Sequence, residues 1–388
     1  MKLLMITGLG SAKDLASGKR GAFYNTLEEF HKYWDRIDII CPKISRGSLK
    51  GGSTSNSPEV EPPRPVFGNV YLHISPWPLI FHPLWFLKKG LEIYKEQKFD
   101  LMTVQEFPPF YNGIGARLLW QKIRVPYVLE IHHIPGYPRA ADPKEEIYRS
   151  LMKLFIEYDA KKAKAVRVVN QNQVPKFLIE AGVPKEKIVY IPSVYLDAEI
   201  FKPLNLPKEY DLIFVGRLEK NKGVSLLLKA ISNVKCQMPN VKCLIVGDGG
   251  MKENLKFEIR NLKLQDNVLL YGWAKDPREI AELLNKSKLL VMPSYNEGGP
   301  RVVVEALACG VPVLATEVGI VLDLAGTNKP GLIKIGWDAE DISQKAEELL
   351  GNDNYYKEQS NGALELARPF EKKVAIRNYA QKLQSFIR

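Results

Sequence analysis

Residues 291–316 read "VMPSYNEGGPRVVVEALACGVPVLAT", which predicts an apolar strand, a glycine-rich turn, a helix and a second strand. Pro300 suits the first position of this helix because its missing N–H would be unpaired there, and Gly310 and Pro312 would end the helix. Strand, helix and strand in this order form a βαβ unit, whose strands are parallel. The stretch therefore predicts a parallel sheet covered by helices.

The same alternation of short apolar runs and amphipathic stretches extends over most of the 388 residues. "KLLMIT" and "YVLEI" are such runs in the first half, and "DLIFVGRL" and "KLLVMPSY" in the second. A proline-punctuated segment interrupts the alternation at residues 189–210. Since cores stop growing beyond roughly 250–300 residues, we predict two Rossmann-like, doubly wound parallel-sheet α/β domains. Their expected bounds are 1–192 and 210–369, with a linker at 193–209.

Two other segments differ from this alternation. Residues 43–68 are rich in Gly, Ser and Pro and show no apolar period, which predicts a long loop. Residues 369–388, "PFEKKVAIRNYAQKLQSFIR", have the pattern of one helix.

Composition excludes several classes of protein. The net charge of +11 fits a phosphate-bearing ligand, an anionic membrane surface or nucleic acid, and does not choose among them. The four cysteines have no CxxC spacing and histidines number only five, so we expect no metal cluster and a reduced, cytoplasmic compartment. The apolar N-terminal run is too short for a signal peptide. The sequence has no run of about 18 apolar residues, so no membrane span is predicted.

The turn before residue 300 has the chemistry of a diphosphate site. The free N–H groups of the first helical turn and the positive end of the helix dipole would make an anion site at residues 299–302. Glu297 and Glu305 would repel phosphate, so hydroxyl groups are their natural targets, and phosphate flanked by hydroxyls indicates a sugar nucleotide. The alternative is that Glu297 caps the helix and Glu305 is a solvated surface residue.

A second turn supplies cations. In "DLIFVGRLEKNKG" (residues 211–223) a strand ends near Gly216, and Arg217 and Lys222 follow before the next helix. These two side chains could neutralise a diphosphate without a metal, or they could simply be surface cations.

Four segments together resemble the retaining glycosyltransferases of family 4. They are "FVGRLEKNKG", "LIVGDGG", "MPSYNEGGPRVVVEALACGVPVLAT" and "VYIPSVYLDAEIFKP". The resemblance implies the GT-B fold, in which two Rossmann-like domains face a central cleft, with a C-terminal helix at about 370–388 that packs back on the first domain.

The resemblance also implies roles for residues of the second domain. Arg217 and Lys222 would bind the donor diphosphate, Glu297 the donor-sugar hydroxyls, and Glu305 the ribose. The remaining donor contacts would come from the backbone of Gly299, Pro300 and Arg301 and, beside the nucleobase, from Gly272 and Trp273. Because the family often has an aromatic residue where Gly299 stands, we expect a wider pocket there.

In the first domain, "VPYVLEIHHIPG" resembles a family strand that ends in a histidine near the donor sugar, here His132. Its neighbour His133 is expected to point elsewhere. Gly21 matches the second glycine of a paired-glycine loop, whose first glycine is replaced by Arg20. "PSVYLD" at 192–197 lacks a glycine that the family usually has.

The resemblance implies a retaining hexosyltransferase. Its donor would be a UDP- or GDP-sugar and its acceptor a hydroxyl of a glycan or polyprenol-linked lipid, with no cofactor and no required metal. Another GT-B enzyme, an epimerase or phosphorylase, is the alternative. An NAD-dependent oxidoreductase is disfavoured because Lys13 replaces the third glycine of GxGxxG, and no motif indicates nucleic-acid binding.

Residues 77–89, "WPLIFHPLWFLKK", combine aromatic and basic side chains. This composition suits the surface of an anionic bilayer, which would place the protein at the inner membrane surface. It equally suits a helix that packs on the first sheet with its lysines in water.

Overall fold

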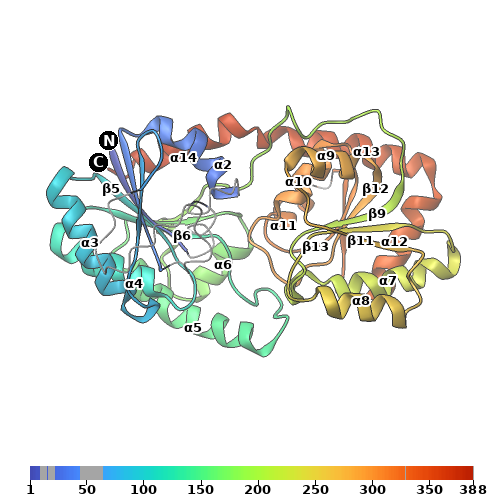
Figure 1. The fold of residues 1–388 in the computed structure, drawn as a ribbon, viewed down its shortest axis with the longest axis horizontal. Helices are drawn as coiled ribbons and strands as arrows, with labels where there is room; N and C mark the ends of the chain where they lie inside the picture. Colours follow the sequence, from blue (N-terminus) through green and yellow to red (C-terminus); the bar gives the residue numbers. More distant parts are fainter. Residues whose placement is uncertain (9–14, 16–21, 44–63, 328, 388) are drawn as a thin grey trace, which may run out of the picture.

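The computed structural model describes residues 1–8, 15, 22–43, 64–327 and 329–387. Two α/β domains lie side by side along the long axis of the molecule, each built on its own sheet (Figure 1). The first sheet has the order β3-β4-β2-β1-β5-β6-β7-β8 and the second the order β11-β10-β9-β12-β13-β14. The predicted pair of doubly wound domains is therefore confirmed.

The first sheet is parallel except at one edge. Its parallel strands are β1 (Lys2–Ile6), β2 (Arg36–Cys41), β4 (Val70–Ile74), β5 (Leu101–Gln105), β6 (Tyr127–Ile131), β7 (Ala165–Val168) and β8 (Ile188–Tyr190). The edge strand β3 (Arg64–Phe67) is antiparallel to β4.

Strand β3 corrects the prediction of a loop over residues 43–68, because residues 64–67 form the antiparallel edge strand. Only Gly68 and Asn69 separate β3 from β4, and a connection this short allows a hairpin but not a parallel crossover. Gly68 has a φ of +51°, which glycine adopts without strain. Residues 44–63 lie outside the described part of the chain.

Helices cover both faces of the first sheet (Figure 1). One face carries α3 (His82–Gln97), α4 (Tyr111–Ile123), α5 (Pro143–Ala160) and α6 (Gln173–Glu180), which share one apolar core. The other carries α2 (Ala22–Phe30) and α14 (Lys372–Gln384), which share a second core.

The second sheet is parallel throughout. Its strands are β9 (Tyr210–Val215), β10 (Cys243–Val246), β11 (Val268–Gly272), β12 (Ser287–Met292), β13 (Val313–Thr316) and β14 (Leu332–Ile335). Its helices are α7 (Val224–Gln237), α8 (Lys252–Asn261), α9 (Pro277–Asn285), α10 (Arg301–Ala308), α11 (Ile320–Ala325), α12 (Ala339–Gly351) and α13 (Asp353–Ala367). Two apolar cores again lie on the two faces of the sheet.

The chain crosses between the domains twice. After α13, a short 3-10 helix (Arg368–Phe370) leads back to α14, beside the outgoing segment, where the N–H of Leu196 donates to the carbonyl of Phe370. The ring of Tyr379 on α14 stacks on Phe30 of α2, with centroids 4.8 Å apart. The last helix of the chain is therefore part of the first domain's core. None of the helices in the described ranges is long and apolar enough to cross a bilayer.

Candidate active site between the domains

The turn after β12 packs directly on the end of β6. A Cβ atom at Gly298 would lie 1.6 Å from the carbonyl oxygen of His132, so only glycine fits at this position. Asn170 of the first domain also contacts this turn, because its Nδ2 donates to the carbonyl of Gly298 at a distance of 3.0 Å. This close approach of two backbones brings Glu297 of the second domain beside His132 and His133 of the first.

Glu297 pairs with a lysine of its own domain. Nζ of Lys222 donates to Oε1 of Glu297, and the hydroxyl of Ser294 donates to the same oxygen at 3.2 Å. Lys222 ends the 3-10 helix Lys220–Lys222, which lies between β9 and α7, and both side chains of the pair are 14% exposed. Two residues 75 positions apart thus place a cation and a hydrogen-bond acceptor at one point of the domain interface.

Asn296 joins the two domains at the same turn. Its Oδ1 lies 2.8 Å from Nε2 of His133, and its Nδ2 donates to the carbonyl of Arg139 and to Oε2 of Glu145. Burial lowers the pKa of His133, which favours the neutral ring. Asn296 was not predicted from the sequence, although it immediately precedes Glu297. His133 reaches it across the interface.

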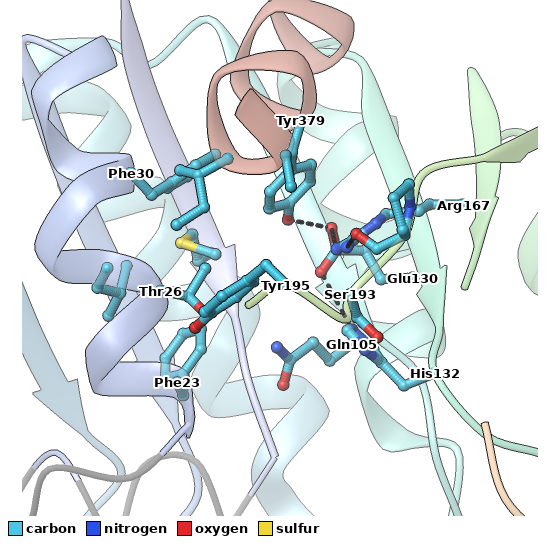
Figure 2. Close-up of a pocket in the computed structure, with 15 residues that line it drawn as sticks. Phe23, Thr26, Phe30, Gln105, Glu130, His132, Arg167, Ser193, Tyr195 and Tyr379 are labelled. Carbon is cyan, nitrogen blue, oxygen red and sulfur yellow. Dashed lines mark hydrogen bonds and ion pairs between the residues drawn. The ribbon is translucent and has the colours of Figure 1, made fainter. Parts of the chain in front are cut away.

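His132 is the exposed end of a buried charged network (Figure 2). Its side chain is 39% exposed, and its Nε2 lies 3.6 Å from Oε2 of the buried Glu130. Oε1 of Glu130 accepts hydrogen bonds from Nη1 of Arg167 at 2.9 Å and from the hydroxyl of Tyr379. Burial opposes ionisation of Glu130, but the charge of Arg167 and the hydrogen bonds outweigh it and lower the pKa of Glu130 to about 2.

Arg167 ties this network to the chain crossing. Its remaining N–H groups donate to the carbonyls of Ile191 and Pro192, both at 3.2 Å, and its guanidinium lies 3.8 Å from the ring centroid of Tyr379. Glu130 and Arg167 are register partners on β6 and β7. The sequence carried a signal for the pair, because each is the only charged residue within an otherwise apolar run, "YVLEI" and "AVRVV".

A small cavity of about 60 Å³ lies beside His132 (Figure 2). Helices α2 and α14 line it mainly with apolar side chains, and its polar lining includes Gln105, Glu130 and Ser193. The hydroxyl of Tyr195, another lining residue, lies 2.6 Å from that of Thr26. Because ligand pockets usually measure about 300–1,000 Å³, this space suits water rather than a sugar.

Residue Glu305 on α10 differs from a solvated surface carboxylate. It is partly buried, and burial raises its pKa to about 7 against the opposing effect of Arg301. Within the described ranges its carboxylate has no hydrogen-bond partner. Arg301 itself reaches the first domain, where its guanidinium lies 4.4 Å from the ring centroid of Tyr195.

Arg217 is exposed after β9, and its side chain has no partner in the described part of the chain. The loop that carries it packs on the glycine-rich turn after β10. A Cβ at Gly247 would lie 1.8 Å from the carbonyl oxygen of Gly216, and one at Gly249 would lie 2.6 Å from that of Leu218. The motif "GDGG" therefore allows the backbone to support the Arg217 loop.

Gly272 and Trp273 lie at the carboxyl end of β11 in the second sheet. Gly272 ends β11 with a φ of +90° and accepts a hydrogen bond from the N–H of Gly247 at 2.7 Å. Trp273 is 69% exposed. Gly272 ends β11 and Arg217 follows β9, with β10 between these two strands. Gly272, Trp273 and Arg217 therefore all lie at the carboxyl end of the second sheet.

Three details of the donor loops differ from expectation or cannot be compared. A Cβ at Gly299 would lie 2.8 Å from Cγ2 of Val194, so Val194 occupies the space that was expected to widen the pocket. Pro300 is the N-cap of α10 rather than its first residue. Gly21 lies outside the described residues.

Comparison with known proteins places these features in a family context. Residues 197–365 match the family model described as Glycosyl transferases group 1. An uncharacterized glycosyltransferase of Methanocaldococcus jannaschii is 34% identical over 245 residues, which are 59% of this chain and 58% of that protein. An undecaprenol-linked-glycan α-1,4-N-acetyl-D-galactosaminyltransferase of Campylobacter jejuni is 28% identical over 75% of each chain.

Two solved structures share the whole fold. Sucrose-phosphate synthase from Thermosynechococcus elongatus has a TM-score of 0.79 at 17% identity, covering 99% of this chain and 98% of that one. HepE from Anabaena, solved in complex with UDP and glucose, has a TM-score of 0.72 at 18% identity, covering 99% and 100%. These likenesses establish the GT-B architecture of the two domains.

Proposed function

We propose that this chain, a glycosyltransferase of the GT-B fold with a group 1 second domain, transfers a hexose from a UDP- or GDP-sugar to a hydroxyl of a glycan or polyprenol-linked acceptor. The observation that carries the proposal is the Lys222–Glu297 pair, at the turn that packs on the backbone of His132. It combines a cation for phosphate with an acceptor for sugar hydroxyls at the meeting point of both domains.

The donor site follows from the groups that have unused hydrogen-bonding capacity. An ammonium has three N–H donors, so Lys222 can keep Glu297 and still bind a phosphate oxygen. Arg217 supplies a second cation, and the first turn of α10 supplies N–H groups at Arg301 and Val302. Glu305, which has no partner in the described ranges, is the proposed acceptor for ribose hydroxyls.

The donor's base and the anomeric outcome are part of the proposal. UDP is favoured because HepE, which shares the fold over its whole length, was solved with UDP and glucose. In the proposed reaction the bond from C1 to the phosphate oxygen breaks, and its electron pair goes to the diphosphate. The acceptor oxygen bonds to C1 from the same face while its proton passes to the departing phosphate, so the configuration is retained.

Protein charges take up the negative charge that develops on the leaving group. Arg217 and Lys222 would neutralise the diphosphate, so the proposal requires no divalent ion. His132 would bind the donor sugar, with Glu130 behind it. A GT-B epimerase or phosphorylase and an NAD-dependent oxidoreductase are not favoured, since the curated relatives described above are named as glycosyltransferases.

The proposal includes a contact between segment 77–89 of the first domain and a membrane at the cytoplasmic face. The support is that four apolar side chains of this segment are 42–66% exposed, namely Leu79, Ile80, Phe81 and Leu84. Trp85 is buried with Phe86 in the core, as the packed-helix alternative predicted. The lipid-linked acceptor named for the Campylobacter relative is consistent with a bilayer surface.

Replacing Glu297 tests the proposal most directly. In Glu297→Gln the ionised acceptor is lost, and hydrogen bonds to charged groups contribute about 1.5–3 kcal/mol, so turnover of the donor should fall roughly 10- to 150-fold. Rates with UDP- and GDP-hexoses, and NMR of the product anomer, are the measurements. Glu253→Gln, at an exposed glutamate on α8, is the matched control.

Normal turnover in Glu297→Gln would contradict the assignment of the donor site. A product with inverted configuration would contradict retention. Activity that depends on added divalent metal and is lost with a chelator would contradict the proposed role of the two cations.

A further inference from the structure

Helix α5 has a second apolar face, and that face points away from the core. Ile147, Leu151, Leu154 and Tyr158 are 60%, 36%, 69% and 45% exposed. Their spacings of four, three and four residues align them along one side of the helix. Met152, Ile156 and Asp159 are buried on the opposite side.

Exposed basic side chains border this outer face. Lys144 lies in its first turn, and Lys161 and Lys162 directly follow its last. By helical spacing, Lys144, Lys161 and Lys162 flank the apolar row, whereas the exposed Glu146 and Glu157 both lie on the side toward Ser150. The guanidinium of Arg117 on α4 adds a further cation, 3.6 Å from the ring centroid of Tyr158.

The outer face of α5 belongs to the same helical layer as residues 79–84. Helices α3, α4 and α5 share one core on one face of the first sheet (Figure 1). Within residues 79–84, the exposed side chains come from the short helix Leu79–Phe81 and from Leu84 in the first turn of α3, whereas His82 is buried. Lys88 of α3 lies 6.0 Å from the ring centroid of Trp77, so this group also combines apolar and basic side chains.

We propose that the outer face of α5 docks the first domain on an anionic lipid bilayer, together with residues 79–84. Contiguous exposed apolar side chains mark an interaction surface. Long cationic side chains beside them suit an anionic bilayer, whose headgroups are negatively charged and whose interior is apolar. The inference rests on the proposed function for its purpose, because a lipid-linked acceptor would be held at that bilayer.

The position of α5 connects docking to the site. Glu145 in its first turn accepts a hydrogen bond from Asn296 at 2.8 Å, and Asn296 adjoins Glu297. Arg149, one turn later, donates to the carbonyl of Gly136 in the loop that follows His132. Glu145 and Arg149 lie on the opposite side of α5 from the outer face, so a bilayer against that face would lie about one helix diameter, roughly 10 Å, from the loop that follows His132.

Co-sedimentation of the full chain with vesicles tests this surface. The probes are vesicles of phosphatidylcholine alone and of an equal mixture of phosphatidylcholine and phosphatidylglycerol. The wild type should bind the mixed vesicles, bind phosphatidylcholine weakly, and bind less in high salt. The double variant Ile147→Gln/Leu154→Gln should bind the mixed vesicles about tenfold less or weaker still.

Phe257→Gln is the matched control, because Phe257 is a 65% exposed apolar residue on α8 of the second domain. It should bind vesicles like the wild type. Lys144→Gln/Lys161→Gln should lower binding and reduce its salt dependence. A thermal shift on adding UDP separates the two hypotheses, because the α5 variants should keep that shift.

Wild-type chain that stays in the supernatant with both vesicle types would overturn the inference. So would unchanged vesicle binding in the double variant, or a wild-type dimer in light scattering that the double variant dissociates, since a second copy would then cover the face. Loss of the UDP shift with vesicle binding intact would count against the proposed function and leave the docking surface standing.

Discussion

The charged cluster around Glu130 and the cluster around Glu297 meet at one domain interface, but their charges are satisfied differently. In the first, Glu130, Arg167 and Tyr379 are at most 5% exposed, and each bonds to other protein groups. In the second, Lys222 and Glu297 are 14% exposed and pair with each other. Arg217 and Glu305, which we propose belong to the same donor site, have no side-chain hydrogen-bond partner in the described ranges.

This difference in bonding distinguishes a rigid cluster, around Glu130, from a cluster that can bind a ligand, around Glu297. In the buried cluster, the hydrogen bonds among Glu130, Arg167 and Tyr379 hold the geometry before any ligand arrives. Within the described residues, Oε2 of Glu130 is the oxygen of this carboxylate that has no hydrogen-bond partner. A cluster with unused donors and acceptors at a protein surface gains its remaining hydrogen bonds when a ligand binds. We infer that the first domain fixes the position of His132, while the second domain supplies most of the donor's contacts.

Replacing one arginine in each cluster should give the largest contrast. Arg167→Met leaves Glu130 buried without its cation, and breaking a buried ion pair typically costs about 3–5 kcal/mol of unfolding free energy. Arg217→Met makes the same change at an exposed side chain and should alter stability by less than about 0.5 kcal/mol. Urea unfolding of both variants measures these costs.

The UDP-induced thermal shift should respond in the opposite order. Arg217→Met should reduce the shift, because a cation for the diphosphate is lost. Equal stability losses in the two arginine variants would remove the distinction between a rigid cluster and a ligand-binding one.

The sequence predicted the second cluster better than the first for a physical reason. Glu297, Gly298 and the start of α10 lie within one turn. Lys222 is 75 positions away, but it lies in a second turn that follows a strand, so a local pattern marks each side of the pair. The partners of Glu130 are 37 and 249 residues away, and only the tertiary fold brings them together. A lone charge within each of two apolar strands was the available signal, and a parallel register could have paired them.

Other differences also arise from long-range packing. The strands and helices followed their apolar periods, whereas β3 depended on a two-residue hairpin that periodicity does not reveal. Composition identified residues 77–89 as aromatic and basic, but only the fold decides that Trp85 faces the core while Ile80 faces solvent. Val194 fills the space beside Gly299 from over 100 positions away in the sequence.

Glu305→Gln tests the ligand-binding cluster through its dependence on pH. Burial raises the pKa of Glu305 from 4.5 to about 7, so between these values the folded chain holds a proton that the unfolded chain has released. Wild-type stability should therefore fall as pH rises through this window, by about 1–3 kcal/mol in total, and then level off. The glutamine variant should lack this part of the fall.

Donor binding should show the opposite trend with pH. Ribose hydroxyls donate to the ionised carboxylate, so wild-type affinity for UDP should rise between about pH 6 and pH 8 and stay flatter in Glu305→Gln. Urea unfolding and calorimetric UDP titration at several pH values measure the two trends. Parallel curves for variant and wild type would show that Glu305 does not titrate in this range or does not contact the nucleotide.

Tyr379→Phe should have the smallest effect and sharpens the account of the rigid cluster. Burial, together with the adjacent Glu130, raises the pKa of Tyr379, so its hydroxyl keeps the proton that it donates to Glu130. Removing that one donor leaves Arg167 in place, so the loss of unfolding free energy should be about 1–2 kcal/mol.

Tyr356→Phe is the matched control, because it removes a hydroxyl bonded to the neutral carbonyl of Lys288, and it should cost less unfolding free energy. Urea unfolding of the two variants gives the comparison. A loss as large as that of Arg167→Met would mean that the C-terminal helix, rather than the Glu130–Arg167 charge pair, holds the end of β6 in place.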